Sequence, residues 1–327
     1  MRKKINWLLI LQGWAMLWVV IGHSPLGEVN NGPLWENVLF RFAYSFHMPL
    51  FMLVSGWLFY RTRLRGGQKW SYNNIVKDKV IRLLLPGLVF SVVAFTLKVV
   101  FPGEISRQTG LGLKEIAHAF MYPNDNPLRE LWFIATLFWF FVLTPLWKQT
   151  LKDKKSMILS LIVLVVLHIS HPNIEFLCLG RVCGYAIWFY CGLLISKMDI
   201  VENSFSRNFW LTILAGVLVY VIGTYVHPLV VTIGGILLSF GLALFLDRYI
   251  PQTFFSFRNY TYQIFLMGIF AQILIKILFK KFGLPYIPTY LLCIAAGLYV
   301  PVIISKIAES LGWKPLLLCI GLKKLKS

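Results

Sequence analysis

The sequence predicts an all-α integral membrane protein, and three observations lead to this fold class. Hydrophobic residues make up 58% of the 327 positions and charged residues only 14%, whereas soluble chains have about 45–50% apolar and about 25% charged residues. The mean hydropathy is +0.70. A membrane-crossing helix needs about 20 apolar residues, and the chain contains a series of such runs with short connections. This composition excludes a disordered chain, a soluble Rossmann enzyme and a disulfide scaffold.

We predict a bundle of about ten transmembrane helices in a single domain that covers residues 1–327. Lipid offers no hydrogen-bond partners, so each apolar run must bond its own backbone groups and is expected to be helical. The fifth run is short, and the seventh and eighth are separated only by His227 and Pro228. The runs cover about 5–24, 38–60, 80–101, 129–147, 156–170, 177–196, 208–226, 228–247, 260–279 and 288–309.

The first runs carry additional local signals. The run 5–24 is too long for the apolar part of a signal peptide and no small-residue cleavage site follows it, so we expect a retained helix. Pro49 in the run 38–60 frees a backbone carbonyl within the membrane, which suits a helix that lines a cavity. The segment 102–128 combines several Pro and Asn residues with a short amphipathic stretch near 111–120, and we expect a re-entrant or interfacial cap there.

Positive charge sets the predicted orientation. The net charge is +19, from 32 Lys and Arg against 13 Asp and Glu. With a cytosolic N-terminus, most Lys and Arg fall on internal segments, as the positive-inside rule requires. This pattern supports an even number of spans with the N- and C-termini both cytosolic. Membrane topology therefore explains the basic surplus, and nucleic acid is not an expected partner.

The five cysteines predict neither a disulfide framework nor a metal site. They form no Cys-x-x-Cys pair, and four of them lie inside apolar runs, where Cys usually packs as a small hydrophobic residue. We therefore expect no metal and no resident cofactor.

Polar and ionisable residues inside the apolar runs are candidates for function. Arg or Asp at the centre of a bilayer costs about 2.5–3.5 kcal/mol on insertion scales. In the predicted orientation His23, Arg41 and Arg181 fall toward the outer half of the membrane, and His47 lies deeper. Each Arg also has a structural explanation, because a long side chain near the edge can extend to the lipid headgroups. The candidate site-lining residues are Gln12, Ser24, Arg41, His47, Ser55, Glu130, Trp132 and Arg181.

Four segments form a larger pattern. They are Gln12-Gly13 followed by Val19 to Ser24, Phe46 to Phe51 followed by Ser55 to Phe59, Lys79 to Pro86, and Leu131 to Ile134. In this order and spacing they resemble the acyltransferase-3 family of membrane acyltransferases, which acylate the sugars of surface glycans. The resemblance covers nearly the whole chain and is densest over residues 5–140. It is closest to the branch similar to fucose 4-O-acetylases and capsular polysaccharide O-acetyltransferases.

The chain departs from the family pattern at three places. Gln12 stands where the family commonly has Arg or Lys, and Leu9 stands where it has an acidic residue. Lys79 replaces an Arg in the basic pair. The family often shows Ile-Tyr-Leu-x-His near the end, where this chain ends the same stretch at Gly268. If the missing charges orient the donor or the acceptor, the protein differs in donor choice or is inactive.

The resemblance implies transfer of an acyl group, with acetyl the expected group, from cytosolic acetyl-CoA or another acyl-CoA to a hydroxyl of an envelope glycan sugar. This reaction needs a base for the alcohol proton and a donor for the tetrahedral oxyanion. His23 is the predicted base because imidazole titrates near neutral pH. A covalent acyl-histidine intermediate is the alternative to direct transfer. Gln12, Arg41 and Ser24 are the candidates for the oxyanion donor.

The anionic donor is expected to bind the basic surface after the second run. Lys79 and Arg82 are three residues apart and can present both charges on one helix face. Arg61 and Arg63 add guanidinium groups, which suit phosphate, although membrane topology explains them equally well. The first helix rises about 27 Å before it reaches His23, so the pantetheine arm must enter the bundle.

Two other functions remain open at this point. In a secondary transporter or exporter of a small molecule or glycan, the polar residues of the first two runs would line a translocation path, but the sequence shows neither paired broken helices nor repeats. A non-catalytic scaffold for glycan assembly is suggested only by the missing charges. The expected partners are acyl-CoA, a glycan or lipid-linked saccharide acceptor and the lipid bilayer, in a bacterial inner membrane. The oligomeric state is not predicted.

Overall fold

The computed structural model describes residues 5–27, 33–65, 71–100 and 112–322. Within these residues every regular element is a helix and no strand occurs, which confirms the all-α prediction. The chain divides into two compact units, and each is described by itself. The first unit comprises Met1–Val54 and Met198–Ser310, and the second comprises Ser55–Lys197 and Leu311–Ser327. The single domain expected from the sequence stays a prediction.

The helices of the first unit lie where the apolar runs predict them. The helix α2 (Leu34–Phe59) begins in this unit and continues into the second. The other elements are α1 (Asn6–Gly22), η6 (Val201–Phe205), α10 (Phe209–Val226), α11 (Pro228–Tyr249), α12 (Thr261–Phe282) and α13 (Tyr286–Leu311), whose last residue belongs to the second unit.

The second unit contains more short helices than the sequence predicts. The amphipathic stretch expected near 111–120 forms α5, while residues 101–111 of the expected cap lie outside the described residues. The elements are η2 (Tyr60–Leu64), α3 (Tyr72–Lys79), η3 (Val80–Leu84), α4 (Leu85–Val100), α5 (Leu113–Met121), η4 (Pro123–Asp125), α6 (Leu131–Val142), α7 (Thr144–Thr150), α8 (Lys154–Ser170), η5 (Phe176–Cys178), α9 (Leu179–Lys197) and α14 (Lys314–Cys319).

Among the described residues, seven helices are long and apolar enough to cross a membrane, or eight if the bent pair α6 and α7 counts as one span. Two of the ten predicted runs, 5–24 and 156–170, form the 17-residue helices α1 and α8. At about 1.5 Å per residue each is about 26 Å long, somewhat less than the hydrocarbon core of a bilayer. The count of ten and the cytosolic termini therefore stay predictions.

The predicted run 129–147 is not one straight helix. It forms α6 and α7, which are bent by 57°. Pro145 in the first turn of α7 has no N–H to donate to the carbonyl of Phe141 four residues earlier. The Thr144 hydroxyl donates to this carbonyl instead, at 2.5 Å. The sequence prediction missed the break because it weighed only the apolar length of the run.

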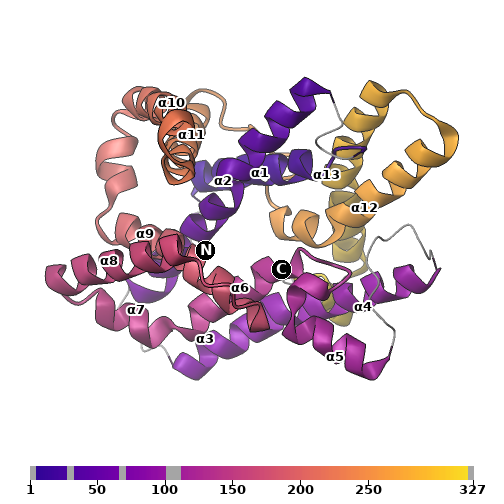
Figure 1. The fold of residues 1–327 in the computed structure, drawn as a ribbon, viewed down its shortest axis with the longest axis horizontal. Coiled ribbons are helices and arrows are strands. Elements are labelled where there is room, and N and C mark those ends of the chain that lie inside the picture. Colours follow the sequence, from indigo (N-terminus) through magenta and orange to yellow (C-terminus); the bar gives the residue numbers. More distant parts are fainter. Residues whose placement is uncertain (1–4, 28–32, 66–70, 101–111, 323–327) are drawn as a thin grey trace. The chain divides into compact units, whose positions relative to one another are not determined.

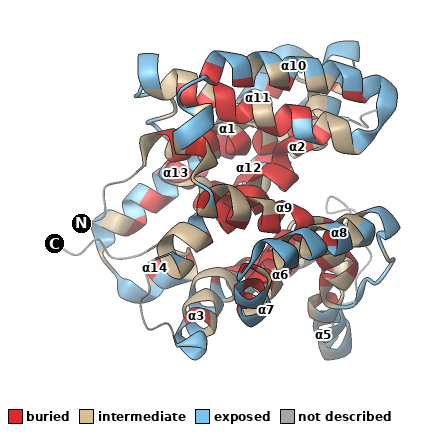
Figure 2. Ribbon diagram, turned by 90° about the vertical axis from the view of Figure 1, so that its left-hand side faces the viewer, coloured by how far each residue is buried: buried red, intermediate tan, exposed pale blue. Residues whose placement is uncertain are grey.

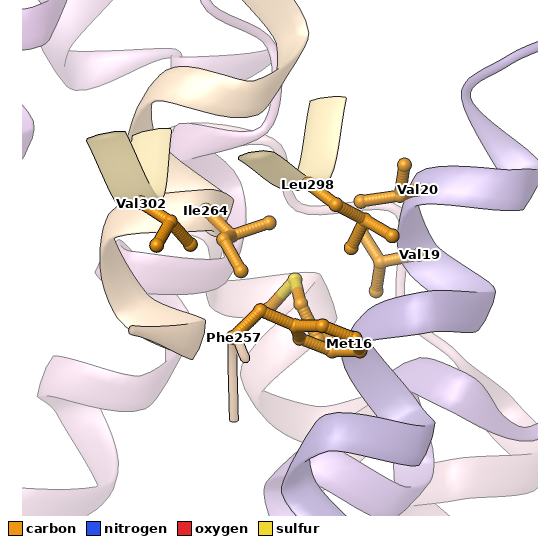
Figure 3. Close-up of a cluster of buried hydrophobic side chains, with 7 residues drawn as sticks. All are labelled: Met16, Val19, Val20, Phe257, Ile264, Leu298 and Val302. Carbon is orange, nitrogen blue, oxygen red and sulfur yellow. The ribbon is translucent and has the colours of Figure 1, made fainter. Parts of the chain in front are cut away.

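Helix α1 lies in the core of the first unit. Met16, Val19 and Val20 pack with residues from α12, α13 and the turn before α12, as Figure 3 shows. Buried residues also gather on α1, α2 and α12 in Figure 2. This burial fixes α1 over most of its length, which matters because the candidate base follows its last residue.

Helices α10 and α11 form a tight hairpin and lie side by side in Figure 1. Glycines make this approach possible, because a Cβ on Gly216 would meet the backbone of Leu238, and one on Gly234 would meet the backbone of Tyr220. The turn between the helices is His227, whose Nδ1 accepts a hydrogen bond from the Leu229 N–H at 3.1 Å and caps α11. The predicted boundary at His227 and Pro228 is confirmed.

The second unit is centred on aromatic residues. Phe189 of α9 contacts the rings of Phe59, Phe140 and Trp147 at centroid distances of 4.9–6.1 Å. Gly56 of α2 lies directly against the Phe189 carbonyl, so a larger residue has no room there. This packing holds the end of α2, and with it the basic segment η2, against α9.

Candidate active site

The predicted base, His23, is the residue that ends helix α1. Its N–H bonds to the carbonyls of Val19 and Val20 at 3.1 and 3.2 Å, and its side chain is half-buried. The His23 carbonyl accepts a hydrogen bond from Nζ of Lys276 on α12 at 2.8 Å. A helix C-terminus leaves its last carbonyls without partners and carries partial negative charge, so a cation satisfies both features.

A second side chain of α12 holds the same end of α1. Nε2 of Gln272 donates to the Val20 carbonyl and to Oγ of Ser24, both at 2.9 Å. The Ser24 hydroxyl in turn donates to the Val20 carbonyl at 2.7 Å. Gln272 is 2% exposed and Ser24 is fully buried. We call Ser24, Gln272 and Lys276 the α1 clamp, since together they fix the backbone on which His23 sits.

The clamp depends on a close crossing of α12 and α13. A Cβ on Gly268 would lie 2.8 Å from the Gly297 carbonyl oxygen, and one on Gly297 would lie 3.0 Å from Cγ of Gln272. The Gly297 carbonyl is free of an intrahelical partner because Pro301 stands four residues later. Gly268 is the position where the family pattern often has His. This chain therefore has no room for an imidazole there, and one turn later it places Gln272 against α1.

The ring of Tyr44 neighbours both histidines that the sequence predicts as site residues, His23 and His47. The centroid of Tyr44 is 6.1 Å from that of His23 and 5.0 Å from that of His47. Nδ1 of the buried His47 donates to the Ala43 carbonyl at 2.5 Å, which leaves the lone pair on Nε2. The arrangement brings His23 and His47 to the same aromatic side chain on α2.

Pro49 acts differently from the sequence expectation. It frees the carbonyl of Ser45, and the hydroxyl of Thr232 on α11 donates to this carbonyl at 2.7 Å. The freed group is therefore used to join α2 to α11, and the expectation that this helix lines a cavity stays a prediction.

The two remaining predicted residues of the first unit lie on α1 and α2. Gln12 is half-buried and stands 11 residues before His23, which corresponds to about 16 Å along the helix. Arg41 is exposed and lies three residues before Tyr44, so both project from one side of α2. Arg41 therefore lies on the side of α2 that carries Tyr44, whereas Gln12 is about 16 Å along α1 from His23.

In the second unit, two of the four residues predicted to bind acyl-CoA share one acidic side chain. Asp78 accepts from Nη2 of Arg63 at 3.1 Å and from Nε of Arg82 at 2.7 Å. Nζ of Lys79 lies 3.8 Å from the ring centroid of Phe141. We call Arg63, Asp78, Lys79 and Arg82 the basic cluster. Arg61 is the fourth residue predicted to bind acyl-CoA, and its guanidinium carbon lies 5.2 Å from the ring centroid of Trp57.

The structure joins two other predicted residues of the second unit. The guanidinium of Arg181 stacks 4.3 Å above the ring of Trp132 and donates to Oδ1 of Asn124 at 3.1 Å. Arg181 therefore bonds within the protein. Glu130 directly precedes α6, and Ser55 is half-buried in α2.

Sequence reasoning missed Tyr44, Asp78, Gln272 and Lys276. Lys276 lies near the end of an apolar run, where a basic residue is common, and Gln272 is a neutral residue in the same run. A signal was present, since Gln272 and Lys276 are four residues apart and share one face of their helix. Among the described residues, no group of three or more His, Cys, Asp or Glu side chains is placed to hold a metal ion.

Comparison with known families gives the class of protein. A family model described as an acyltransferase domain matches residues 5–306. The chain belongs to the acyltransferase-3 family of membrane acyltransferases.

Two curated relatives, both named nodulation protein NolL, match parts of the chain. The protein from Mesorhizobium japonicum is 30% identical over 136 residues, which are 40% of this chain and 33% of the relative. The protein from Sinorhizobium fredii is 28% identical over 180 residues, which are 52% of this chain and 46% of the relative. The match spans less than half the length of each relative. No solved structure matches the chain.

Proposed function

We propose that this protein is a membrane O-acyltransferase that moves an acyl group, with acetyl the expected group, from cytosolic acyl-CoA to a hydroxyl of an envelope glycan sugar. The observation that carries the proposal is the α1 clamp, seen in a chain of this family. Gln272 and Lys276 hold the backbone at Val20 and His23, so the half-buried imidazole is presented by a fixed helix end. A general base is effective only where its position is fixed relative to the reacting proton.

In the proposed reaction His23 takes the proton of the sugar hydroxyl while the hydroxyl oxygen attacks the thioester carbonyl. The tetrahedral oxyanion then collapses, the carbon–sulfur bond breaks, and the CoA thiolate takes the proton back from His23. An attack by His23 itself, through an acyl-histidine, is the covalent alternative. Transfer by either route needs no external redox partner.

Of the three predicted oxyanion donors, we favour Arg41. Ser24 already donates its hydroxyl hydrogen to the Val20 carbonyl, and Gln12 is about 16 Å along the helix from His23. Arg41 is exposed and lies on the same side of α2 as Tyr44, whose ring neighbours His23. A guanidinium is also a strong charge-assisted donor to an oxyanion.

We further propose that the basic cluster and Arg61 hold the phosphates of acyl-CoA on the cytosolic side, and that both termini are cytosolic in a bundle of ten spans. The expected location is a bacterial inner membrane. Arg63 and Arg82 already converge on a carboxylate, which shows that they can share one anion.

The test is acyl transfer by the purified full chain. Radiolabelled acetyl-CoA is incubated with candidate envelope glycans and wild type, His23→Ala or His227→Asn. The last variant is a matched control, because Asn also caps a helix and His227 caps α11. Wild type and His227→Asn are expected to transfer label, and His23→Ala to lose at least about 100-fold in rate.

Three results contradict parts of the proposal. Equal transfer by His23→Ala removes the base assignment. If radiolabel stays bound to the wild-type protein after the reaction is quenched, and does not stay on His23→Ala, the reaction follows the covalent acyl-histidine route and not direct transfer. Glycan flux in proteoliposomes without acyl transfer favours a transporter.

A further inference from the structure

The basic cluster already contains an anion of its own. Each carboxylate oxygen of Asp78 takes one guanidinium, Oδ1 from Arg82 and Oδ2 from Arg63. The side chains of Asp78 and Arg63 are 24% and 28% exposed, and that of Arg82 is 41% exposed, so a soluble ligand can reach them. The carboxylate therefore occupies the donors that the proposed function assigns to a phosphate.

Backbone geometry supports this arrangement. Arg63 lies in η2 and Arg82 in η3, and both segments are π-helical turns. Such turns are rare and often mark functional sites. The segment η2 packs on α9, and η3 packs on α6, so each Arg projects from a supported backbone. Asp78 lies four residues before Arg82 and is delivered to both arginines by its own helix.

We propose that Asp78 is a resident anion that acyl-CoA displaces, so that it determines which phosphate compounds the basic cluster accepts. This inference rests on the proposed acyl-CoA site. A ligand phosphate that takes Arg63 and Arg82 from Asp78 forms two ion pairs and breaks two. A compound with one phosphate group gains little from this exchange, because Asp78 is tethered and acts at a high effective concentration.

Coenzyme A differs because it carries a diphosphate and a separate ribose phosphate. Its additional charges can meet Lys79 and Arg61 after the first phosphate has displaced Asp78. Inorganic phosphate and the headgroup of an anionic lipid lack those extra contacts. Asp78 thus keeps the cluster from being filled by the phosphate groups that are abundant at a membrane surface.

The experiment measures, by calorimetry on the full chain in a neutral detergent, the separate binding of CoA, of inorganic phosphate and of phosphatidylglycerol. Asp78→Asn is expected to bind CoA about 5- to 30-fold more tightly than wild type, as expected from the loss of two partly exposed ion pairs. Inorganic phosphate and phosphatidylglycerol, each titrated without CoA, should also bind Asp78→Asn more tightly than wild type. Asp78→Glu keeps the charge on a longer side chain, and its CoA affinity should lie between those of wild type and Asp78→Asn.

Two controls make the result specific. Asp153→Asn removes an acid that caps α8, where Asn is an equally good cap, and it should leave CoA binding unchanged. Arg82→Gln should weaken CoA binding. Thermal unfolding checks that each variant is folded, and Asp78→Ser replaces Asp78→Asn if the latter does not fold.

The inference is overturned if Asp78→Asn binds CoA as wild type does, or more weakly, while Arg82→Gln weakens binding. It is also overturned if inorganic phosphate, titrated without CoA, binds wild type and Asp78→Asn with equal affinity. Failure of wild type and all variants to bind CoA has a different meaning, since it contradicts the proposed donor and hence the function itself.

Discussion

Gln272 of α12 donates its side-chain amide to the carbonyl of Val20, one turn before the end of α1. The two residues are 252 positions apart in the sequence, near the beginning and the end of the family domain. The position of His23 therefore depends on a contact between these two parts of the domain.

Gln272→Leu should lower the rate of acyl transfer while leaving the KM for acyl-CoA nearly unchanged. The substitution removes the two hydrogen bonds that Nε2 donates, to the Val20 carbonyl and to the Ser24 hydroxyl, each worth about 0.5–1.5 kcal/mol. We expect a fall in kcat of about 10- to 100-fold, since a displaced base acts poorly. Steady-state kinetics measure this, and Gln252→Leu, at an exposed position, is the control. A change in KM alone would assign Gln272 to donor binding.

Gly268→His should not improve the enzyme, although it restores the residue that the family pattern often shows. Even a Cβ at this position would lie 2.8 Å from the Gly297 carbonyl oxygen, so α12 and α13 would have to separate. We expect a lower yield of folded protein and lower activity, measured by size-exclusion chromatography in detergent and by acyl transfer. Gly283→Ala is not a useful control because Gly283 has a positive φ. Gly27→Ala is preferable, since nothing lies within 4 Å of a Cβ there. Full activity of Gly268→His would show that the crossing is not tight.

Thr232→Val should destabilise the protein, because it removes the donor to the Ser45 carbonyl that Pro49 leaves free. The expected loss in the free energy of unfolding is about 1–2 kcal/mol. The loss should be smaller in a Pro49→Ala background, where residue 49 regains an N–H for the same carbonyl. Unfolding of the four proteins of this double-mutant cycle in mild detergent measures the coupling. Equal losses in both backgrounds would mean that Thr232 acts independently of Pro49.

Arg181 and Trp132 should be energetically coupled in a double-mutant cycle. The guanidinium lies 4.3 Å above the indole ring, a geometry in which a cation–π interaction contributes about 0.5–2 kcal/mol. Arg181→Gln and Trp132→Leu are expected to destabilise the protein by less in combination than the sum of the two single changes. Arg181→Lys keeps the charge but lacks the planar group that also reaches Asn124, and it should recover only part of the loss. Additive effects would contradict the coupling.

Much of the fold follows from the sequence because membrane helices are specified by their own apolar runs. The turn at His227 and Pro228 was predicted correctly, since a two-residue polar break leaves little choice of boundary. The break at Pro145 was missed, because the run around it is apolar throughout and only the local carbonyl geometry reveals the bend.

The candidate site was less accessible to sequence reasoning. His23 was found through the family pattern, but its neighbours act through backbone carbonyls, which no sequence motif displays. The role of Gln272 follows only from its hydrogen bond to the Val20 carbonyl, and the role of Lys276 only from its hydrogen bond to the His23 carbonyl. Asp78 was not predicted, although its two partners, Arg63 and Arg82, were both among the residues predicted to bind acyl-CoA.

The hairpin of α10 and α11 has a consequence for assembly in the bilayer. Its two helices are joined by a single residue and approach through glycines, so their mutual contact closes almost no loop and loses little chain entropy. Such a pair can form as soon as both segments have left the ribosome and entered the membrane, before α12 and α13 are made. The hairpin can then pack as one preassembled unit on α1, which is made earlier and contacts α11.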